Sequence, residues 1–323
     1  MIRIVRASLF AVLCAPLAAP AVAADSYPER PVRLIVPFAP GGGVDINARI
    51  LAEPLGQALG QTIVADNRPG ASSIIGTKVA SMAAPDGYTL LINAVTVAIN
   101  AAVYKKLPFD IQRDFAPVSR LTQQPNILVA NPSLPAKTAQ EFVALVRSQP
   151  GKYSFGSAGL ATGIRLAMEM LLLKANAKMV HVPYKSLSPA LVGLLGNEVS
   201  VLVSTFASAL PHVKAGRLRA YGVTTAQRVD LLPDVPTLAE SGVPGYDYAT
   251  WYGLFVPAGT PPHIIDKLNK VTVTALNSPK LTQIYQAQGL TATPSSPAEF
   301  ARFIDSELKK WADVVRDAKI ERQ

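Results

Sequence analysis

The stretch VRLIVPFAPGGGVDINARILAEPLGQALG, residues 32–60, decides the fold. Its residues 34–38 form an apolar run with the length of a buried strand, and three consecutive glycines follow shortly after it. Apolar side chains then recur at helical spacing up to Gly60, which is expected to end the helix. A strand, a tight turn and a helix in this order predict α/β structure with a parallel sheet. The buried face of the helix is expected to hold Ile46, Ile50, Leu51, Leu55, Ala58 and Leu59.

The same alternation of strands and helices continues along the chain. Strands predicted at 62–65 and 88–93, with a helix at 73–83 between them, complete one β-α-β-α-β unit. A helix over 138–148, with Thr138 and Glu141 at capping-box spacing, belongs to a second α/β unit. The strands predicted for that second unit are 126–130, 153–155, 179–182, 199–203 and 218–223.

The last part of the chain reads differently, because no strand is expected after residue 260. A final helix carries an apolar stripe at helical spacing, which predicts packing against a sheet. The stripe consists of Phe300, Phe303, Ile304, Leu308, Trp311, Val314 and Val315.

Composition excludes a disordered chain, because 49% of the 323 residues are hydrophobic and only 16% are charged. The length favours two units that share a cleft over one large core. The formal charge of +9 fits either a nucleic-acid surface or a general field that attracts small anions. Basic residues occur singly or in pairs, without a run of five, which favours the field and predicts no nucleic-acid partner.

The N-terminus predicts export. Arg3 and Arg6 precede an apolar run over 7–24 that is broken by prolines and contains Ala-Val-Ala before its end, as in a cleavable signal peptide over residues 1–23. Its removal lowers the formal charge from +9 to +7, because both arginines leave with it. Cys14, the only cysteine, leaves too. The mature chain is then expected outside the cytoplasm, without a disulfide, a thiol nucleophile or a Cys-bound metal.

The glycine turn is the first candidate for chemistry. Glycines before a helix expose backbone N–H groups that lack partners in the first turn, and such a terminus accepts a carboxylate or phosphate. A plain turn is the alternative. A P-loop is excluded because no Gly-Lys-Ser/Thr follows, and Ile46 stands where a dinucleotide-binding loop needs a small residue. Asp45 either braces the loop or contacts a ligand, and Gly43→Val is expected to block ligand approach while preserving the fold.

Similar junctions of a strand end, small residues and a helix start recur after the predicted strands, at 93–96, 155–163, 184–188 and 204–208. Each one alone is ordinary N-capping, but together at the carboxyl ends of strands they would line one crevice. No spacing of His181, His212 and His263 predicts a zinc site, so no metal is expected. A serine hydrolase that uses Ser157, with His181 as its base, remains an alternative function.

Ordered motifs along nearly the whole mature chain resemble one family, the Bug (TctC-type) solute-binding proteins of tripartite tricarboxylate transporters. The motifs in the first half are Tyr27-Pro28-x-Arg30-Pro31, Gly41-Gly-Gly-Val-Asp45, Leu59-Gly60-Gln61, Asp66-Asn67-Arg68-Pro69-Gly70-Ala71 and Pro85-Asp86-Gly87-Tyr88-Thr89-Leu90. Those in the second half are Val182-Pro-Tyr-Lys185, Ala215-Gly-Arg-Leu-Arg219, Pro233-Asp-Val-Pro-Thr237 and Pro257-Ala-Gly-Thr-Pro261.

The resemblance implies a type II periplasmic binding protein, with two α/β lobes joined by two crossover segments and a ligand cleft between them. Lobe 1 would comprise residues 24–124 and 251–323, and lobe 2 residues 125–250. The implied function is that of a monomeric receptor, not an enzyme and without a cofactor. It would bind a small mono-, di- or tricarboxylate, or an amino acid, and deliver it to membrane permease subunits.

Carried onto this sequence, the family's ligand contacts fall on residues of both lobes. Two positions depart from the family pattern and could alter ligand choice: Ser186, where glycine is usual, and Arg165, near a position often held by histidine. The implied contacts are Phe38, Ala39, Gly42, Gly43, Asp45, Ala94, Thr96, Ser157, Ala158, Thr162 and Thr205.

Overall fold

The computed structural model of the protein describes residues 27–230 and 232–323. The predicted signal peptide and Cys14 lie outside this part of the chain. Within it, no helix combines the length and the hydrophobicity needed to cross a membrane.

The first sheet is built around the strand that begins the stretch 32–60. Strand β1 (Val32–Val36) lies between β2 (Ile63–Asn67) and β3 (Thr89–Ala94) and is parallel to both. On its other side β3 pairs antiparallel with β9 (Ala249–Pro257), which pairs in turn with β4 (Phe115–Ala130). The helices of this part are α1 (Gly43–Leu59), α2 (Ile74–Ser81), α3 (Thr96–Val103), α8 (Pro262–Leu276) and α9 (Pro279–Ala287).

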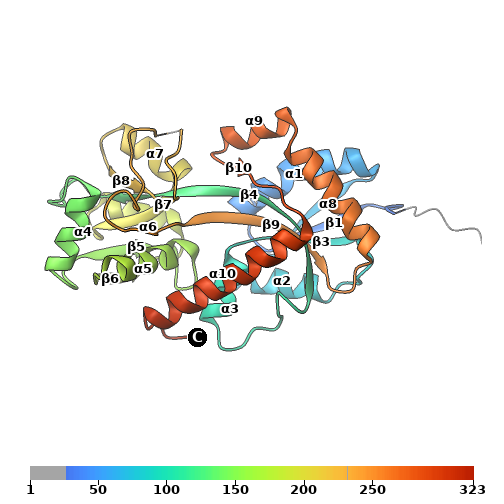
Figure 1. The fold of residues 1–323 in the computed structure, drawn as a ribbon, viewed down its shortest axis with the longest axis horizontal. Helices are drawn as coiled ribbons and strands as arrows, with labels where there is room; N and C mark the ends of the chain where they lie inside the picture. Colours follow the sequence, from blue (N-terminus) through green and yellow to red (C-terminus); the bar gives the residue numbers. More distant parts are fainter. Residues whose placement is uncertain (1–26, 231) are drawn as a thin grey trace, which may run out of the picture.

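Strand β4 connects this sheet to a second one. Its residues 115–125 pair with β9, whereas residues 126–130 pair with the second sheet's β7 (Val201–Thr205) and β8 (Arg219–Val223). Figure 1 shows β4 and β9 running side by side between the two halves of the molecule. The second sheet continues through β5 (Ser154–Ser157) to β6 (Val180–Pro183), and its helices are α4 (Ala139–Ser148), α5 (Gly163–Ala175), α6 (Leu187–Leu195) and α7 (Phe206–Lys214).

The strand directions make the carboxyl ends of the two sheets face each other. β1, β2 and β3 run parallel to β4, because β3 and β4 are both antiparallel to β9. They therefore point toward the second sheet. β7 is antiparallel to β4, and β5 and β6 are parallel to β7, so these three strands point back toward the first sheet. Loops that follow strands in one half thus face loops that follow strands in the other.

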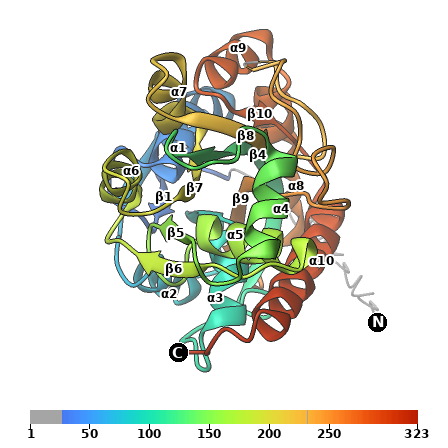
Figure 2. The same ribbon diagram turned by 90° about the vertical axis from the view of Figure 1, so that its left-hand side faces the viewer.

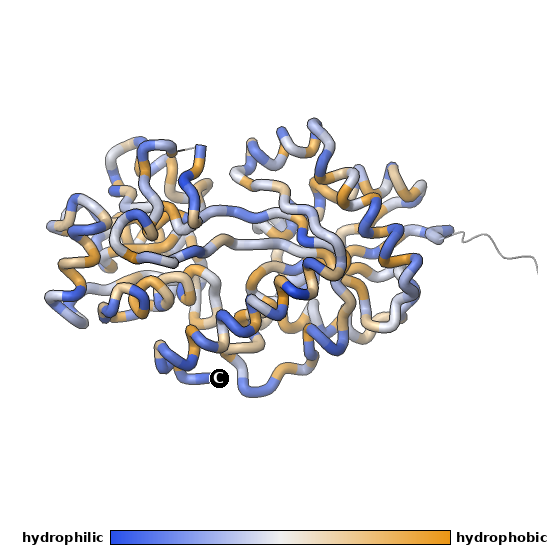
Figure 3. Tube along the Cα trace, viewed as in Figure 1, coloured by the Kyte–Doolittle hydropathy of each residue, from blue (hydrophilic) through white to orange (hydrophobic). Residues whose placement is uncertain are grey.

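The longest helix, α10 (Pro297–Asp317), lies diagonally across the front of the molecule in Figure 1 and along one side in Figure 2. The predicted apolar stripe is confirmed in its main part: Phe300 and Trp311 are fully buried, while Phe303 and Leu308 are only partly buried. Phe300 packs on Phe255 of β9, and Trp311 lies edge-on to Tyr248. One continuous hydrophobic cluster therefore joins α10 to both sheets. Figure 3 shows hydrophobic and hydrophilic residues alternating along α10.

The two-lobed α/β fold is confirmed, but several local predictions are wrong. The first part of β4 was not predicted, because residues 115–125 contain two prolines and many polar side chains and become a strand only through pairing with β9, which was also not predicted. A strand does follow residue 260: β10 (Thr291–Ala292) pairs with β4 and is too short to show a period.

Two details of the predicted helices also differ. At α4 the Thr138 hydroxyl accepts from the Glu141 amide as predicted, but the Glu141 carboxylate accepts from the Lys137 amide instead of closing the capping box. In α1, Ile46 and Ile50 are only partly buried, because the helix turns Asp45 and Asn47 inward, and the predicted core residue Ala58 is exposed. Gly60 ends α1 in the left-handed conformation, as predicted.

Candidate functional site

The predicted contact residues lie on four junctions where a strand leads into a helix. These junctions are β1–α1 and β3–α3 in the first half, and β5–α5 and β7–α7 in the second half. Because the carboxyl ends of the two sheets face each other, the junctions of one half are directed toward those of the other. The β3–α3 and β5–α5 junctions come close at Val95, whose Cγ1 would lie 3.4 Å from a Cβ atom added to Gly163.

The β1–α1 loop presents backbone to solvent. Gly41 has φ of +81°, a conformation that favours glycine, and residues 41–43 are exposed. Gly42 is the N-cap of α1 and has no side chain to cap it. In the described part of the chain no acceptor pairs with the amides of Gly42, Gly43 and Val44. These N–H groups can therefore serve an anion.

Asp45 braces this loop. Its Oδ2 accepts from the Gly41 amide and from Nε of Arg49, both at 2.9 Å, and its Oδ1 accepts from Asn67 at 2.9 Å. The side chain is only 2% exposed. Burial alone would raise the pKa of Asp45, but the hydrogen bonds from Arg49, Gly41 and Asn67 outweigh it, so the pKa lies below its usual value. The carboxylate is thus ionised and fully engaged.

Asn67 belongs to the same brace and was not among the predicted site residues. Its Nδ2 donates to the Phe38 carbonyl at 3.0 Å as well as to Asp45, so it joins both ends of the loop. The sequence signal was the polar triplet Asp66-Asn67-Arg68 after a predicted strand, which places Asn67 at the carboxyl edge beside β1. Phe38 is partly buried and Ala39 exposed.

The β3–α3 junction follows strand β3, which pairs with β1 and so places this junction beside the β1–α1 loop. Ala94 is buried, and its amide donates to Oδ1 of Asn93 at 2.8 Å. The Val95 amide donates to the Trp251 carbonyl of β9, which ties the junction to the crossing strand. Thr96 begins α3 and is partly exposed. Of the two predicted contacts at this junction, Ala94 and Thr96, Thr96 has the side chain that solvent can reach.

The β5–α5 junction is organised around Ser157. Its hydroxyl lies 2.7 Å from Nε2 of His181 and accepts from the Gly159 amide at 3.2 Å. The Thr162 hydroxyl donates to the Gly159 carbonyl at 2.9 Å. Ser157 itself is 0% exposed, whereas Ala158 and Thr162 are partly exposed. In the described residues, the amides of Gly163 and Ile164 at the start of α5 have no acceptor.

His181 supports Ser157 as a neutral group. Its ring stacks on Phe155 with centroids 4.9 Å apart. Burial, and then the charge of Arg165, lower the pKa of His181 from 6.5 to about 4, so the imidazole is uncharged at neutral pH. No carboxylate of the described chain orients its other nitrogen. The pair has the Ser–His contact of a hydrolase but neither the third member nor an exposed nucleophile.

The two departures from the family pattern differ in their surroundings. Arg165 is largely buried; its Nη1 donates to the Leu160 carbonyl at 2.7 Å, and its Nε lies 3.6 Å from Glu169. It therefore holds the β5–α5 loop. Ser186 is the exposed N-cap of α6, and its side chain makes no capping bond.

The last predicted contact, Thr205, lies at the β7–α7 junction. Thr205 caps α7, since its hydroxyl accepts from the Ser208 amide at 3.4 Å.

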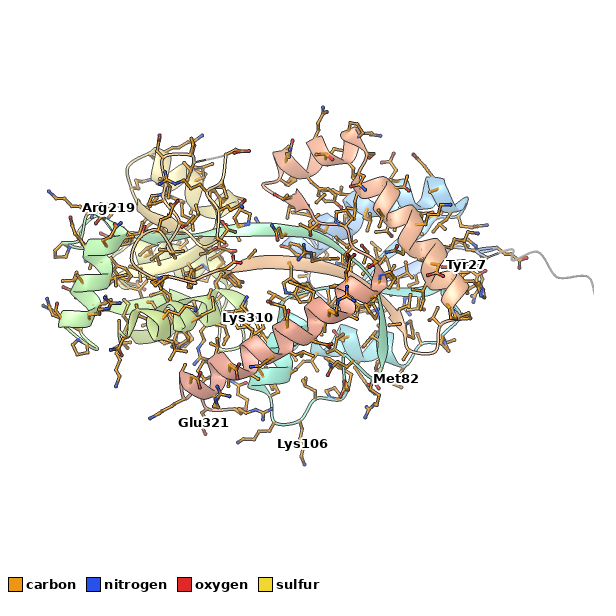
Figure 4. The ribbon with its side chains drawn as sticks, viewed as in Figure 1. Tyr27, Met82, Lys106, Arg219, Lys310 and Glu321 are labelled. Atoms are coloured by element: carbon orange, nitrogen blue, oxygen red, sulfur yellow. The ribbon has the colours of Figure 1, made fainter. Side chains whose placement is uncertain are left out.

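A groove of about 290 Å³ lies elsewhere, beside the crossing strands. Its lining includes Arg120, Trp251, Phe303 and Lys310, together with residues 225–227. Figure 4 labels Lys310 on α10 between the two halves. None of the predicted contact residues lines this groove. No group of three or more His, Cys, Asp or Glu side chains arranged for a metal occurs in the described chain.

Comparison with known proteins identifies the family. The model of the tripartite tricarboxylate transporter family receptors, TctC, matches residues 47–320. Protein BugT of Bordetella pertussis is 37% identical over 305 residues, which cover 94% of this chain and 93% of BugT.

Two solved structures have the same fold over most of this chain. The Rpa4515 protein of R. palustris with adipate is 32% identical, has a TM-score of 0.81, and is matched over 92% of this chain and 100% of that one. MatC of Rhodopseudomonas palustris with bound malate is 31% identical, has a TM-score of 0.76, and is matched over 90% and 100%. This chain therefore belongs to the tripartite tricarboxylate transporter family receptors, the periplasmic solute-binding receptors of TctC or Bug type.

Proposed function

We propose that this receptor captures a small carboxylate between lobe 1, residues 24–124 and 251–323, and lobe 2, residues 125–250. The observation that carries the proposal is the pair of helix N-termini, α1 and α5, which present unpaired amides on facing sheet edges. A helix N-terminus carries about half an elementary positive charge and binds carboxylates without a cationic side chain. Two such termini suit a ligand with a carboxylate at each end.

The proposed contacts divide into two groups. Phe38, Ala39, Gly42, Gly43, Thr96, Ala158, Thr162 and Thr205 are accessible at least in part and would touch the ligand. Asp45, Ala94 and Ser157 are buried and would hold the loops in place. Each hydrogen bond to a charged carboxylate contributes about 1.5–3 kcal/mol, so a few of them support micromolar affinity after the cost of closure.

The ligand class follows from the relatives. Adipate and malate are both dicarboxylates, and they are bound in the two solved structures. We therefore take dicarboxylates as the first class for this chain, ahead of mono- and tricarboxylates and amino acids. Residues 1–23 would direct the chain to the periplasm and be removed there. The closed, loaded form would deliver its ligand to the membrane permease subunits of a tripartite tricarboxylate transporter.

The test is calorimetric titration of the exported protein with adipate and with malate. Gly42→Val should weaken binding by at least about tenfold, because the side chain would cover amides that are worth one charge-assisted bond or more. Gly42 suits this test because its nearest neighbour to an added Cβ is the Ala39 carbonyl at 3.6 Å. Gly196→Val is the matched control: Gly196 is also exposed, has the same φ of −81°, and has its nearest neighbour at 3.5 Å. Wild type that binds no small carboxylate or amino acid refutes the proposal.

The second candidate is an exported serine hydrolase, which the 2.7 Å contact between Ser157 and His181 favours. Its prediction is turnover of a small ester that disappears in Ser157→Ala. A receptor predicts no turnover in either protein and a loss of carboxylate affinity in the variant. Ester turnover that depends on Ser157 would overturn the assignment of this chain as a receptor without enzymatic activity.

A further inference from the structure

Two buried tyrosines lie on the chain segment that returns from the second half to the first. Tyr248 precedes β9 and Tyr252 lies within it, and they are 1% and 4% exposed. The Tyr252 hydroxyl donates to Oε1 of Gln124 on β4 at 3.2 Å. The Tyr248 hydroxyl lies 3.2 Å from Oγ1 of Thr250. Both hydroxyls are thus fixed within the pair of crossing segments.

Each hydroxyl also abuts the first residue of a helix that carries the proposed site. A Cβ atom on Gly43, the first residue of α1, would lie 2.5 Å from the Tyr252 hydroxyl oxygen. A Cβ atom on Gly163, the first residue of α5, would lie 2.3 Å from the Tyr248 hydroxyl oxygen. One helix belongs to each half of the molecule. The same return segment therefore touches both helix termini whose amides face each other.

This contact corrects the expectation for Gly43→Val. The sequence suggested that the substitution would spare the fold, but its side chain would collide with a buried tyrosine. Only the hydroxyl is in the way, because the next ring atom, Cζ, would lie 3.3 Å from the added Cβ of Gly43 and 3.4 Å from that of Gly163. Such distances need at most a small adjustment. Loss of the hydroxyl alone should make room for alanine at either position.

We propose that Tyr248 and Tyr252 are positioning residues, which set the N-termini of α5 and α1 relative to the crossing segments and so couple ligand capture to the hinge. This inference rests on the proposed function, because the amides it positions are the proposed carboxylate contacts. Simple core packing would need only the two rings. Positioning needs the two hydroxyls, since these make both the contact with the glycine and the hydrogen bond to the crossing segments.

The experiment is a set of paired substitutions measured with adipate. Gly43→Ala should weaken affinity about tenfold, which is the loss of one charge-assisted bond. In the double variant Gly43→Ala/Tyr252→Phe, the affinity for adipate should be within threefold of that of the single variant Tyr252→Phe. Tyr248→Phe should rescue Gly163→Ala in the same way, whereas the crossed pairs should give no rescue. The control is Gly193→Ala in α6, where the added Cβ would lie 2.2 Å from the hydroxyl oxygen of Tyr184. This substitution should lower the melting temperature without changing adipate affinity.

Tryptophan fluorescence supplies a second readout at the hinge. The chain has two tryptophans, and the indole N–H groups of Trp251 and Trp311 both donate to Oε2 of Glu307, at 2.8 and 2.9 Å. Adipate should change their emission in wild type and in the rescued double variants, and this change should shrink in the two glycine variants.

The outcomes separate the two proposals. Wild type without carboxylate binding refutes the proposed function and this inference with it. If wild type binds but Gly43→Ala and Gly163→Ala keep full affinity, the positioning inference alone is wrong. It is also wrong if either tyrosine variant rescues both glycines, or if rescue restores the melting temperature but not the affinity.

Discussion

The β1–α1 loop and the β5–α5 loop face each other and are built in contrasting ways. The first is a glycine turn held by the ionised Asp45, which accepts from Gly41, Arg49 and Asn67. The second is held by the uncharged pair Ser157 and His181, together with the Arg165 contact to a loop carbonyl. Both leave the amides at their helix starts without acceptors in the described chain.

This contrast shows that the same backbone surface can be supported by a charged or a neutral anchor. A charged acceptor makes stronger hydrogen bonds, whereas a neutral one brings no negative charge near an anionic ligand. We therefore expect lobe 1 to depend more on its anchor than lobe 2 does. The two anchors should also respond to acid in different pH ranges.

The largest effect is expected from Asp45→Asn. The substitution removes a charge that receives hydrogen bonds from three partners, each worth about 1.5–3 kcal/mol, so adipate affinity should fall about 10- to 100-fold. Calorimetric titration measures the loss, and thermal unfolding should show a lower melting temperature. The control is Asp234→Asn, at an exposed position. Wild-type affinity in Asp45→Asn would show that the loop needs no charged brace.

Ser157→Ala should cost less. Its neutral hydrogen bonds are worth about 0.5–1.5 kcal/mol, which corresponds to a two- to tenfold loss of adipate affinity. The same titration measures it, and Ser306→Ala on the exposed face of α10 serves as control. A loss larger than that of Asp45→Asn would reverse the ranking of the two anchors.

The pH dependence of stability tests the neutral anchor. The pKa of His181 is lowered from 6.5 to about 4 by burial and by Arg165, so between these values the unfolded chain takes up a proton that the folded chain does not. Stability should therefore fall as the pH drops from about 6.5 to about 4 and be unaffected by this group above that range. His181→Gln should flatten this part of the melting-temperature profile relative to wild type. Equal profiles for His181→Gln and wild type would contradict a buried neutral His181.

The smallest effect is expected for the loss of stability at low pH that accompanies protonation of Asp45. The pKa of Asp45 lies below its usual value of 3.8, so its stabilising contribution is present above that pH and is lost as the pH falls further. Acid unfolding followed by circular dichroism should show a shallower slope below about pH 4 in Asp45→Asn than in wild type. A steeper slope in the variant would mean that Asp45 is not ionised in the fold.

Much of the fold was accessible from local patterns. The apolar run before Phe38, the glycine turn and the end of α1 at Gly60 follow from residues close together in the chain. The stripe on α10 was equally readable, because a long helix repeats its buried face several times. Strand β9 and the first part of β4 escaped prediction. Their pairing joins segments more than a hundred residues apart, and β4 carries polar side chains on its way between the lobes.

Apart from β9, β10 and the first part of β4, the sequence by itself determined the alternation of strands and helices, together with the glycine turn and the family motifs, because these features depend on neighbouring residues and on their spacing. Only the tertiary structure decided what the anchors do: Asp45 meets Asn67, Ser157 meets His181, and Gly43 meets Tyr252 across 209 positions of chain. Hydrogen-bond partners and the clearance around a missing Cβ depend on how distant segments are placed. That placement comes from strand pairing and packing of the whole chain.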